Sequence, residues 1–166
     1  WSSIKTGSFW NVHLNDIRQT YKKDDVVNEL DELIRIAVKK RLEADVPIGA
    51  FLSGGLDSSL IVAIMRSLGH ENLQTFSIGF NESNFDELKH ARTVAKLFET
   101  THQEYVVDYN VVDLVPQLLH FFGEPFADSS QIPTILISKF AKNKVSVVLT
   151  GDGGDEIFGG YNRHVW

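Results

Sequence analysis

The sequence predicts an α/β domain built on a doubly wound parallel sheet with helices on both faces. Short apolar runs of strand length alternate with longer segments in which apolar residues recur every three or four positions, which is typical of βαβ units. Two of the short runs lead directly into glycine-rich loops that carry acidic residues, at 53–59 and 151–161. The 166 residues, 43% hydrophobic and 23% charged, are enough to build the core of one such domain.

The chain begins with a segment that has no clean period. Residues 1–23 are therefore expected to form an irregular lead-in, and residues 24–166 the domain itself. Residues 24–43 predict its first helix, with acidic residues early, basic residues late, and an apolar stripe expected to pack on the sheet. The basic end could also be a phosphate or partner patch, but a solvated helix end is the simpler interpretation.

A strand, a loop and a helix are expected next. Ile48–Leu52 predicts a buried parallel strand, and Leu60–Met65 the first turns of a helix packed back on it. Between them, Gly54 and Gly55 allow a sharp turn and a close approach of the main chain to a ligand. Three serines add hydroxyl donors: Ser53, Ser58 and Ser59. Because a helix also presents free N–H groups at its start, this loop predicts a phosphate site.

Asp57 is the unexpected residue in this loop. A carboxylate aimed at a polyphosphate is repulsive unless a cation lies between them, so Asp57 indicates Mg²⁺ bridging to phosphate oxygens. The loop is not a Walker loop, which requires a Lys after its last Gly. The alternative is an ordinary strand-to-helix turn in which Asp or Ser caps the helix.

The rest of the chain continues the alternation of strands and helices. Further strands are expected at 73–79, 102–107 and 145–150, and further helices at 85–98, 111–122 and 134–141. Asp128 lies in a polar segment before the last of these helices. From the residues alone, the simplest interpretation is that it caps that helix.

The second glycine-rich loop runs from Gly151 to Tyr161 and carries Asp152, Asp155 and Glu156. Open α/β sheets bind ligands beyond the carboxyl ends of their strands, so this loop and the loop at 53–59 are expected to face each other. A Ca²⁺-binding loop is a poor alternative, because it needs an ordered alternation of oxygen ligands.

Composition excludes several classes of function. The formal net charge of −6 opposes a nucleic-acid surface, which needs clustered Lys and Arg. The sequence has no Cys, so disulfides and thiolate metal sites are excluded, and the histidines lack the spacing of a metal set. No apolar run reaches the ~20 residues of a membrane helix, and the given sequence does not open with a signal-peptide pattern. We therefore expect a cytoplasmic protein without membrane or nucleic-acid partners.

Two strings carry a resemblance to a known family. Ser53-Gly-Gly-Leu-Asp-Ser58 resembles the pyrophosphate-binding loop of the ATP pyrophosphatases, which have the adenine nucleotide alpha hydrolase-like fold. Together with Asp45–Ser59 and Gly151–Tyr161, it resembles the synthetase domain of glutamine-hydrolysing asparagine synthetases. The resemblance implies that the predicted strands lie in the order third, second, first, fourth. It also implies that 24–166 is the N-terminal part of that domain, with a further strand and a glutaminase domain elsewhere.

The resemblance further implies a set of site residues. ATP would contact Leu52, Ser53, Gly54, Gly55, Asp57, Ser58, Ser59, Ile78, Gly79 and Gly151, with Ile78 and Gly79 against the adenine ring. Asp57 and Asp155 would hold Mg²⁺, and Asp57, Asp152 and Asp155 would be catalytic. Asp128 would lie in a loop that borders the active site, so both a cap and a ligand role stay open for it. Asp152 stands where well-known members have Glu, and Gly154 where some have Ser.

The activity implied is ATP-dependent conversion of aspartate to asparagine through β-aspartyl-AMP, with ammonia from glutamine and release of AMP and pyrophosphate. Two alternatives stay open. One is a related carboxylate-adenylating enzyme with another acceptor, such as a β-lactam synthetase or another amidotransferase. The other is a non-catalytic nucleotide-binding module. The isolated chain is not expected to be fully active, and a homodimer is an open alternative.

Overall fold

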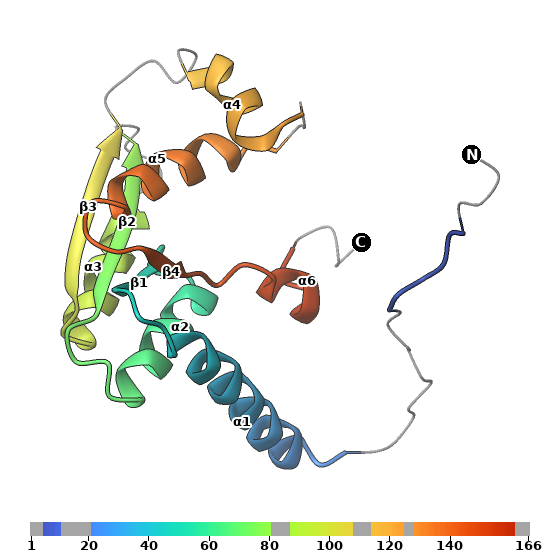
Figure 1. Ribbon diagram of the computed structural model, residues 1–166. Coiled ribbons are helices and arrows are strands. Elements are labelled where there is room, and N and C mark those ends of the chain that lie inside the picture. Colours follow the sequence, from blue (N-terminus) through green and yellow to red (C-terminus); the bar gives the residue numbers. More distant parts are fainter. Residues whose placement is uncertain (1–4, 11–20, 81–86, 108–113, 125–127, 162–166) are drawn as a thin grey trace. The chain divides into compact units, whose positions relative to one another are not determined.

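The computed structural model describes residues 5–10, 21–80, 87–107, 114–124 and 128–161 (Figure 1). The chain divides into two compact units, residues 1–33 and residues 34–166. The first helix, α1 (Lys23–Leu42), contributes to both. Within the described residues, no helix combines the length and the apolar character that crossing a membrane requires.

The second unit contains a sheet of four parallel strands (Figure 1). They are β1 (Ile48–Phe51), β2 (Gln74–Phe80), β3 (Thr101–Val107) and β4 (Val147–Leu149), in the order β3-β2-β1-β4. The predicted order is confirmed. β4 is shorter than expected and lies at one edge of the described sheet, so the further strand beyond it stays a prediction.

Two apolar clusters lie on opposite faces of this sheet. Ala50 and Leu52 belong to one cluster, whereas Phe51 between them packs against the other, because successive strand residues point to opposite faces. The first cluster also contains residues of α1, α2 (Leu56–Ser67) and α3 (Glu87–Leu97). The second contains residues of α5 (Gln131–Ala141). Helices therefore cover both faces, as predicted for a doubly wound sheet.

The remaining helices are α4 (Val115–Phe122) and α6 (Gly154–Phe158). Residues 85–86 and 111–113 of the helices predicted at 85–98 and 111–122 lie outside the described residues. α2 begins at Leu56 rather than residue 60, since small polar and acidic residues are well accommodated in a first turn. α5 begins at Gln131 rather than residue 134, because Pro133 falls in the first turn, where its missing N–H leaves no bond unmade. α6 was not predicted and forms inside the second glycine-rich loop.

The C-terminal half of α1 packs its apolar stripe against the core beside the sheet, as predicted. Ile34, Val38 and Leu42 contact the first cluster. For the part of α1 before residue 34, the expectation of packing on the sheet stays a prediction.

A polar network joins β2, β3 and α3. Thr75 Oγ1 lies 2.7 Å from Thr100 Oγ1 and 3.0 Å from His102 Nδ1. His102 Nε2 is 3.4 Å from Glu104 Oε1, and Arg92 donates two hydrogen bonds of 2.7 Å to the Glu104 carboxylate. Burial lowers the pKa of His102 despite the nearby carboxylate. The hydrogen bonds from Arg92 lower the pKa of Glu104.

We expect His102 to make the folded state sensitive to mild acid. Its folded-state pKa is lower than its ordinary value of 6.5, so below pH 6.5 the unfolded chain binds more protons and the free energy of unfolding falls. The contribution is present above that pH and is lost as the pH falls toward the folded-state pKa. In urea unfolding between pH 7.5 and 5, His102→Gln should flatten this dependence, with exposed His90→Gln as control. Equal slopes for wild type and His102→Gln would contradict the prediction.

Candidate functional site

The two glycine-rich loops meet because β1 and β4 are neighbours in the sheet. Ile48, Gly49 and Ala50 pair with Val147, Val148 and Leu149. Both strands are parallel, so the segments that follow them leave from the same edge (Figure 1). From β1 the chain proceeds to β2 on one side, while β4 lies on the other. This reversal creates the crevice in which open α/β sheets bind ligands.

The loops touch at two glycines. A Cβ built on Gly151 would lie 2.7 Å from Ser58 N and 2.9 Å from Asp57 Cβ. One built on Gly154 would lie 2.7 Å from Asp57 Cγ. At Gly151 the close atoms include backbone atoms of Asp57 and Ser58, so glycine at this position permits the second loop to approach α2 this closely.

A cavity of about 870 Å³ opens between the loops. Three predicted catalytic residues, Asp57, Asp152 and Asp155, all line it. Its carboxylates are those of Asp57, Asp128, Asp152, Asp155 and Glu156, and no Lys, Arg or His is among the lining residues that the structure describes. A polyanion can enter such a cavity only with a compensating cation.

The first loop is organised by serine hydroxyls. Ser58 Oγ lies 3.0 Å from Ser53 Oγ and accepts a hydrogen bond of 3.3 Å from Ser53 N. Ser53 Oγ also accepts from Gly55 N at 3.2 Å. Gly55 caps α2 without any side-chain hydrogen bond to the helix, so the first N–H groups of α2 remain available to an anion. Ser59 Oγ is buried without a hydrogen-bond partner in the described structure.

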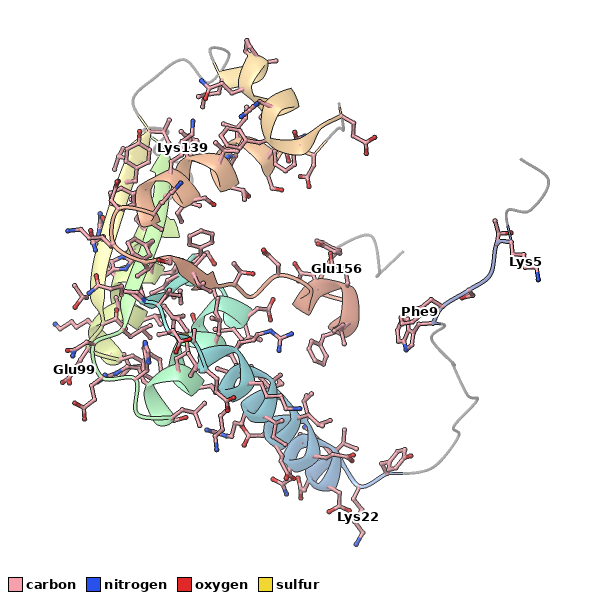
Figure 2. All side chains as sticks on the ribbon, viewed as in Figure 1. Lys5, Phe9, Lys22, Glu99, Lys139 and Glu156 are labelled. Atoms are coloured by element: carbon pink, nitrogen blue, oxygen red, sulfur yellow. The ribbon has the colours of Figure 1, made fainter. Side chains whose placement is uncertain are left out.

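The second loop holds Asp155 on α6. Gly160 N donates to Asp155 O at 3.1 Å, which closes the turn after the helix. Tyr161 donates its hydroxyl hydrogen to Glu156 Oε1 at 2.6 Å. Glu156 is labelled on α6 in Figure 2. Half-buried Asp155 and the exposed Glu156 therefore have different environments on the same short helix.

Asp128 does not cap α5, whose N-cap is Ser130 without a side-chain hydrogen bond to the helix, and its ligand role stays a prediction. Its Oδ1 accepts hydrogen bonds from Ser130 N at 2.8 Å and Ser130 Oγ at 2.7 Å, just before α5. These bonds lower the pKa of the Asp128 carboxyl. Asp128 and Ser130 also line the 870 Å³ cavity. Asp128 therefore orders the turn before α5 at the cavity wall.

The structure does not bring every predicted residue to this cavity. The lining includes Ser53, Gly55, Ser58 and Gly151, but not Leu52, Gly54, Ser59, Ile78 or Gly79. Leu52 is 1% exposed and belongs to the core. A Cβ on Gly79 would lie 2.5 Å from Leu88 Cδ1, so this glycine accommodates α3. The predicted contact of Ile78 and Gly79 with adenine remains a prediction.

Sequence reasoning missed several residues that line the cavity, notably Leu56, Thr134, Thr150 and Tyr161. Thr150 accepts a hydrogen bond of 3.4 Å from Asp152 N. The position of Thr150 between a predicted strand and a glycine-rich loop could have identified it as a cavity residue from the sequence. No feature of the sequence indicated Thr134, because only the packing of α5 brings it to the cavity.

The residues fit a magnesium ion held jointly with a ligand. Among the described residues, no three His, Cys, Asp or Glu side chains are grouped as a metal cage. Asp57 and Asp155 nevertheless share one cavity, and the Asp57 carboxylate packs against Gly154. Mg²⁺ is commonly bound by one or two carboxylates plus substrate phosphates, and the donor set agrees with that mode.

Two solved structures share the fold. The glutamine-dependent NAD⁺ synthetase from Acinetobacter baumannii, in complex with ADP, matches 81% of this chain and 27% of its own, with a TM-score of 0.57 and 24% identity. The NH₃-dependent NAD synthetase from Campylobacter jejuni matches 86% of this chain and 62% of its own, with a TM-score of 0.51 and 18% identity. They confirm the adenine nucleotide alpha hydrolase-like fold.

Two relatives are closer in sequence. A protein of Methanocaldococcus jannaschii, named putative glutamine-hydrolysing asparagine synthetase 2, is 43% identical over 98% of the chain. Glutamine-hydrolysing asparagine synthetase 1 of Bacillus subtilis is 38% identical over 85%. The chain spans 31% and 22% of their lengths. The asparagine synthase family model matches residues 29–166, and the chain therefore belongs to the asparagine synthase family.

Proposed function

We propose that this chain binds ATP with Mg²⁺ in the 870 Å³ cavity and that the protein uses ATP to convert aspartate to asparagine. The observation that carries the proposal is the meeting of the two loops, which places Asp57 and Asp155 at one cavity. Family membership and the names of the relatives support the choice of reaction.

The reaction requires ATP because a carboxylate is a poor electrophile that would have to expel an oxide. Attack of the aspartate side-chain carboxylate on the α-phosphorus forms β-aspartyl-AMP and releases pyrophosphate. Ammonia then attacks the acyl carbon, and AMP leaves as asparagine forms. The protein must therefore hold three phosphates in line with the acceptor and stabilise the charge that develops on the phosphate oxygens.

The first loop is suited to the pyrophosphate part of ATP. The loop and the first turn of the helix after it contain Ser53, Gly54, Gly55, Ser58 and Ser59. The uncapped start of α2 presents N–H groups and the positive end of the helix dipole to the cavity. The unpartnered hydroxyl of Ser59 is a further donor or acceptor, and we assign it to the nucleotide or to its bound water.

Asp57 and Asp155 are the proposed magnesium ligands. Bound there, Mg²⁺ would neutralise phosphate charge and thereby assist pyrophosphate as a leaving group. The carboxylates repel a polyphosphate that has no bound cation, since the described lining carries no cationic side chain. Asp152, exposed on the second loop, is proposed to lie near the reacting carboxyl group. Leu52 and Gly151 are assigned to the nucleotide through their main chain.

Ammonia is proposed to come from glutamine, hydrolysed on a separate glutaminase domain. The relatives carry glutamine hydrolysis in their names, and this chain spans less than a third of each. We keep residues 1–23 as the lead-in and 24–166 as the N-terminal part of the synthetase domain, although the family model begins at residue 29 and the compact units divide after residue 33.

The acceptor can be identified from pyrophosphate release. With ATP, Mg²⁺ and ammonia present, aspartate is expected to stimulate release at least tenfold more than other carboxylic acids. Ten-fold discrimination corresponds to about 1.4 kcal/mol in transition-state binding. The panel should include glutamate, succinate, β-alanine derivatives and a sugar acid. Preference for another acid would favour a β-lactam synthetase-like or other amidotransferase activity. Nucleotide binding without pyrophosphate release for any acceptor would favour a non-catalytic module.

A further inference from the structure

The first glycine-rich loop rests on the backbone of α3. Gly54 in that loop has a φ of 83°, and a Cβ built on it would lie 2.5 Å from Ala91 N and 2.6 Å from His90 C. Both atoms belong to the main chain of α3, so they cannot move aside unless the helix itself shifts. A displacement of α3 at this point therefore displaces the loop that we assign to pyrophosphate.

A second predicted nucleotide contact meets the same helix. A Cβ built on Gly79 of β2 would lie 2.5 Å from Leu88 Cδ1, and Leu88 is one turn before Ala91 in α3. No residue of α3 is among the cavity-lining residues that the structure describes. The helix thus supports two of the predicted nucleotide contacts without lining the cavity itself.

An ion pair fixes α3 beside its contact with Gly54. Ala91 and Ala95 are 0% and 5% exposed, but hydrophobic burial is non-directional and sets the position of a helix along a sheet less sharply than a hydrogen bond does. Arg92 Nε and Nη2 donate hydrogen bonds of 2.7 Å each to Glu104 Oε1 and Oε2 of β3. Such bidentate pairs add geometric specificity. Arg92 directly follows Ala91, so the pair acts where α3 meets the loop.

Glu104 is held in turn by its neighbours on the sheet. His102 Nε2 is buried without a hydrogen-bond partner in the described structure and lies 3.4 Å from Glu104 Oε1. His102 Nδ1 lies 3.0 Å from Oγ1 of the fully buried Thr75. The side chain of Arg92 is 56% exposed, and an ion pair so accessible contributes little to the free energy of unfolding. The pair is therefore better suited to orienting α3 than to stabilising the fold.

We propose that Glu104, acting through Arg92, is a positioning residue that holds α3 against the first glycine-rich loop and thereby sets the affinity for ATP. This inference rests on the proposed binding of ATP with Mg²⁺. Without the pair, α3 shifts relative to Gly54, and the N–H groups of the loop no longer converge on the phosphates. The acceptor and the magnesium ligands lie elsewhere, so catalysis at saturating ATP is preserved.

The test measures steady-state pyrophosphate release by the complete protein, with saturating Mg²⁺ and the preferred acceptor of the panel above. Glu104→Gln and Arg92→Met are each expected to raise the KM for ATP by about three- to thirtyfold, the range for residues that modulate a site without touching its ligand. The kcat and the KM for the acceptor should keep their wild-type values. The double variant should be no worse than either single variant, because each already breaks the pair.

Two further variants separate charge from geometry. Lys89→Met is the matched control, because Lys89 is exposed one turn before Arg92 on α3, and its loss removes the same charge while the pair remains. Its KM for ATP should equal that of the wild type. Arg92→Lys keeps the charge but not the planar fork, so its KM for ATP should lie between those of the wild type and Arg92→Met. This variant decides the question if a truncated one fails to fold.

The outcomes distinguish the inference from the proposed function. A wild-type KM for ATP in Glu104→Gln and Arg92→Met overturns the inference alone. A fall in kcat at unchanged KM for ATP also overturns it, since that result indicates a structural role only. An equal effect of Lys89→Met overturns it as well, because the charge alone would then be responsible. Absence of pyrophosphate release by the wild type with every acceptor overturns the proposed function, and the inference with it.

Discussion

Asp57→Ala is expected to abolish asparagine formation, with a loss of at least about a hundredfold in rate, while glutamine hydrolysis is largely retained. The loss follows because Asp57 is a proposed magnesium ligand in the cavity between the loops, and removal of one electrostatic stabiliser of a developing oxyanion costs about 10²–10³ in rate. Glutamine hydrolysis survives because we assign it to another domain. The measurement is product formation in the complete protein, with asparagine and glutamate quantified separately.

Asp45→Ala provides the control for this variant. Asp45 is also an acidic residue and is exposed, but it precedes β1, whereas Asp57 follows it. The same change in charge is therefore made at the opposite end of the strand, and both activities should remain. Equal loss of both activities in Asp57→Ala, accompanied by unfolding, would contradict the assignment. Retention of full asparagine synthesis would contradict it as well.

Gly54→Ala is expected to lower the free energy of unfolding more than Gly69→Ala does. Gly54 has a φ of 83°, and a Cβ there would lie 2.5 Å from Ala91 N and 2.6 Å from His90 C, both in the backbone of α3. The left-handed conformation costs about 1–2 kcal/mol with a side chain, and overpacking adds about 1–3 kcal/mol. We expect a loss of about 3 kcal/mol in the free energy of unfolding, measured in urea.

Comparison with Gly69→Ala isolates the packing contribution in this prediction. Gly69 has a similar φ of 89°, but nothing lies within 4 Å of its built Cβ, so only the conformational cost of about 1–2 kcal/mol applies. Gly54→Ala should also weaken ATP binding, since displacement from α3 moves the first loop. If the two variants lose the same stability, the close packing of Gly54 on α3 is not a determinant of the fold.

Local patterns along the chain were sufficient to predict the secondary structure class. The apolar run at Ile48–Leu52 predicts a strand, and the following serines and glycines predict a phosphate loop. The strand order came from the family resemblance and was confirmed. The boundaries were less accurate, because the loop at 53–59 was expected to end before the helix, and α2 instead begins at Leu56. Asp57 thus lies in a helical turn.

The sequence alone determined that this is a doubly wound α/β domain with two acidic glycine-rich loops, because alternation, glycine and charge are properties of short segments. Only the tertiary structure decided that Gly154 lies against the Asp57 carboxylate and that Thr134 reaches the cavity. Such contacts join residues almost one hundred positions apart or on different helices. They depend on how closely β1, β4 and their loops pack. Differences of a few tenths of an ångström in packing distance cannot be predicted from local periodicity.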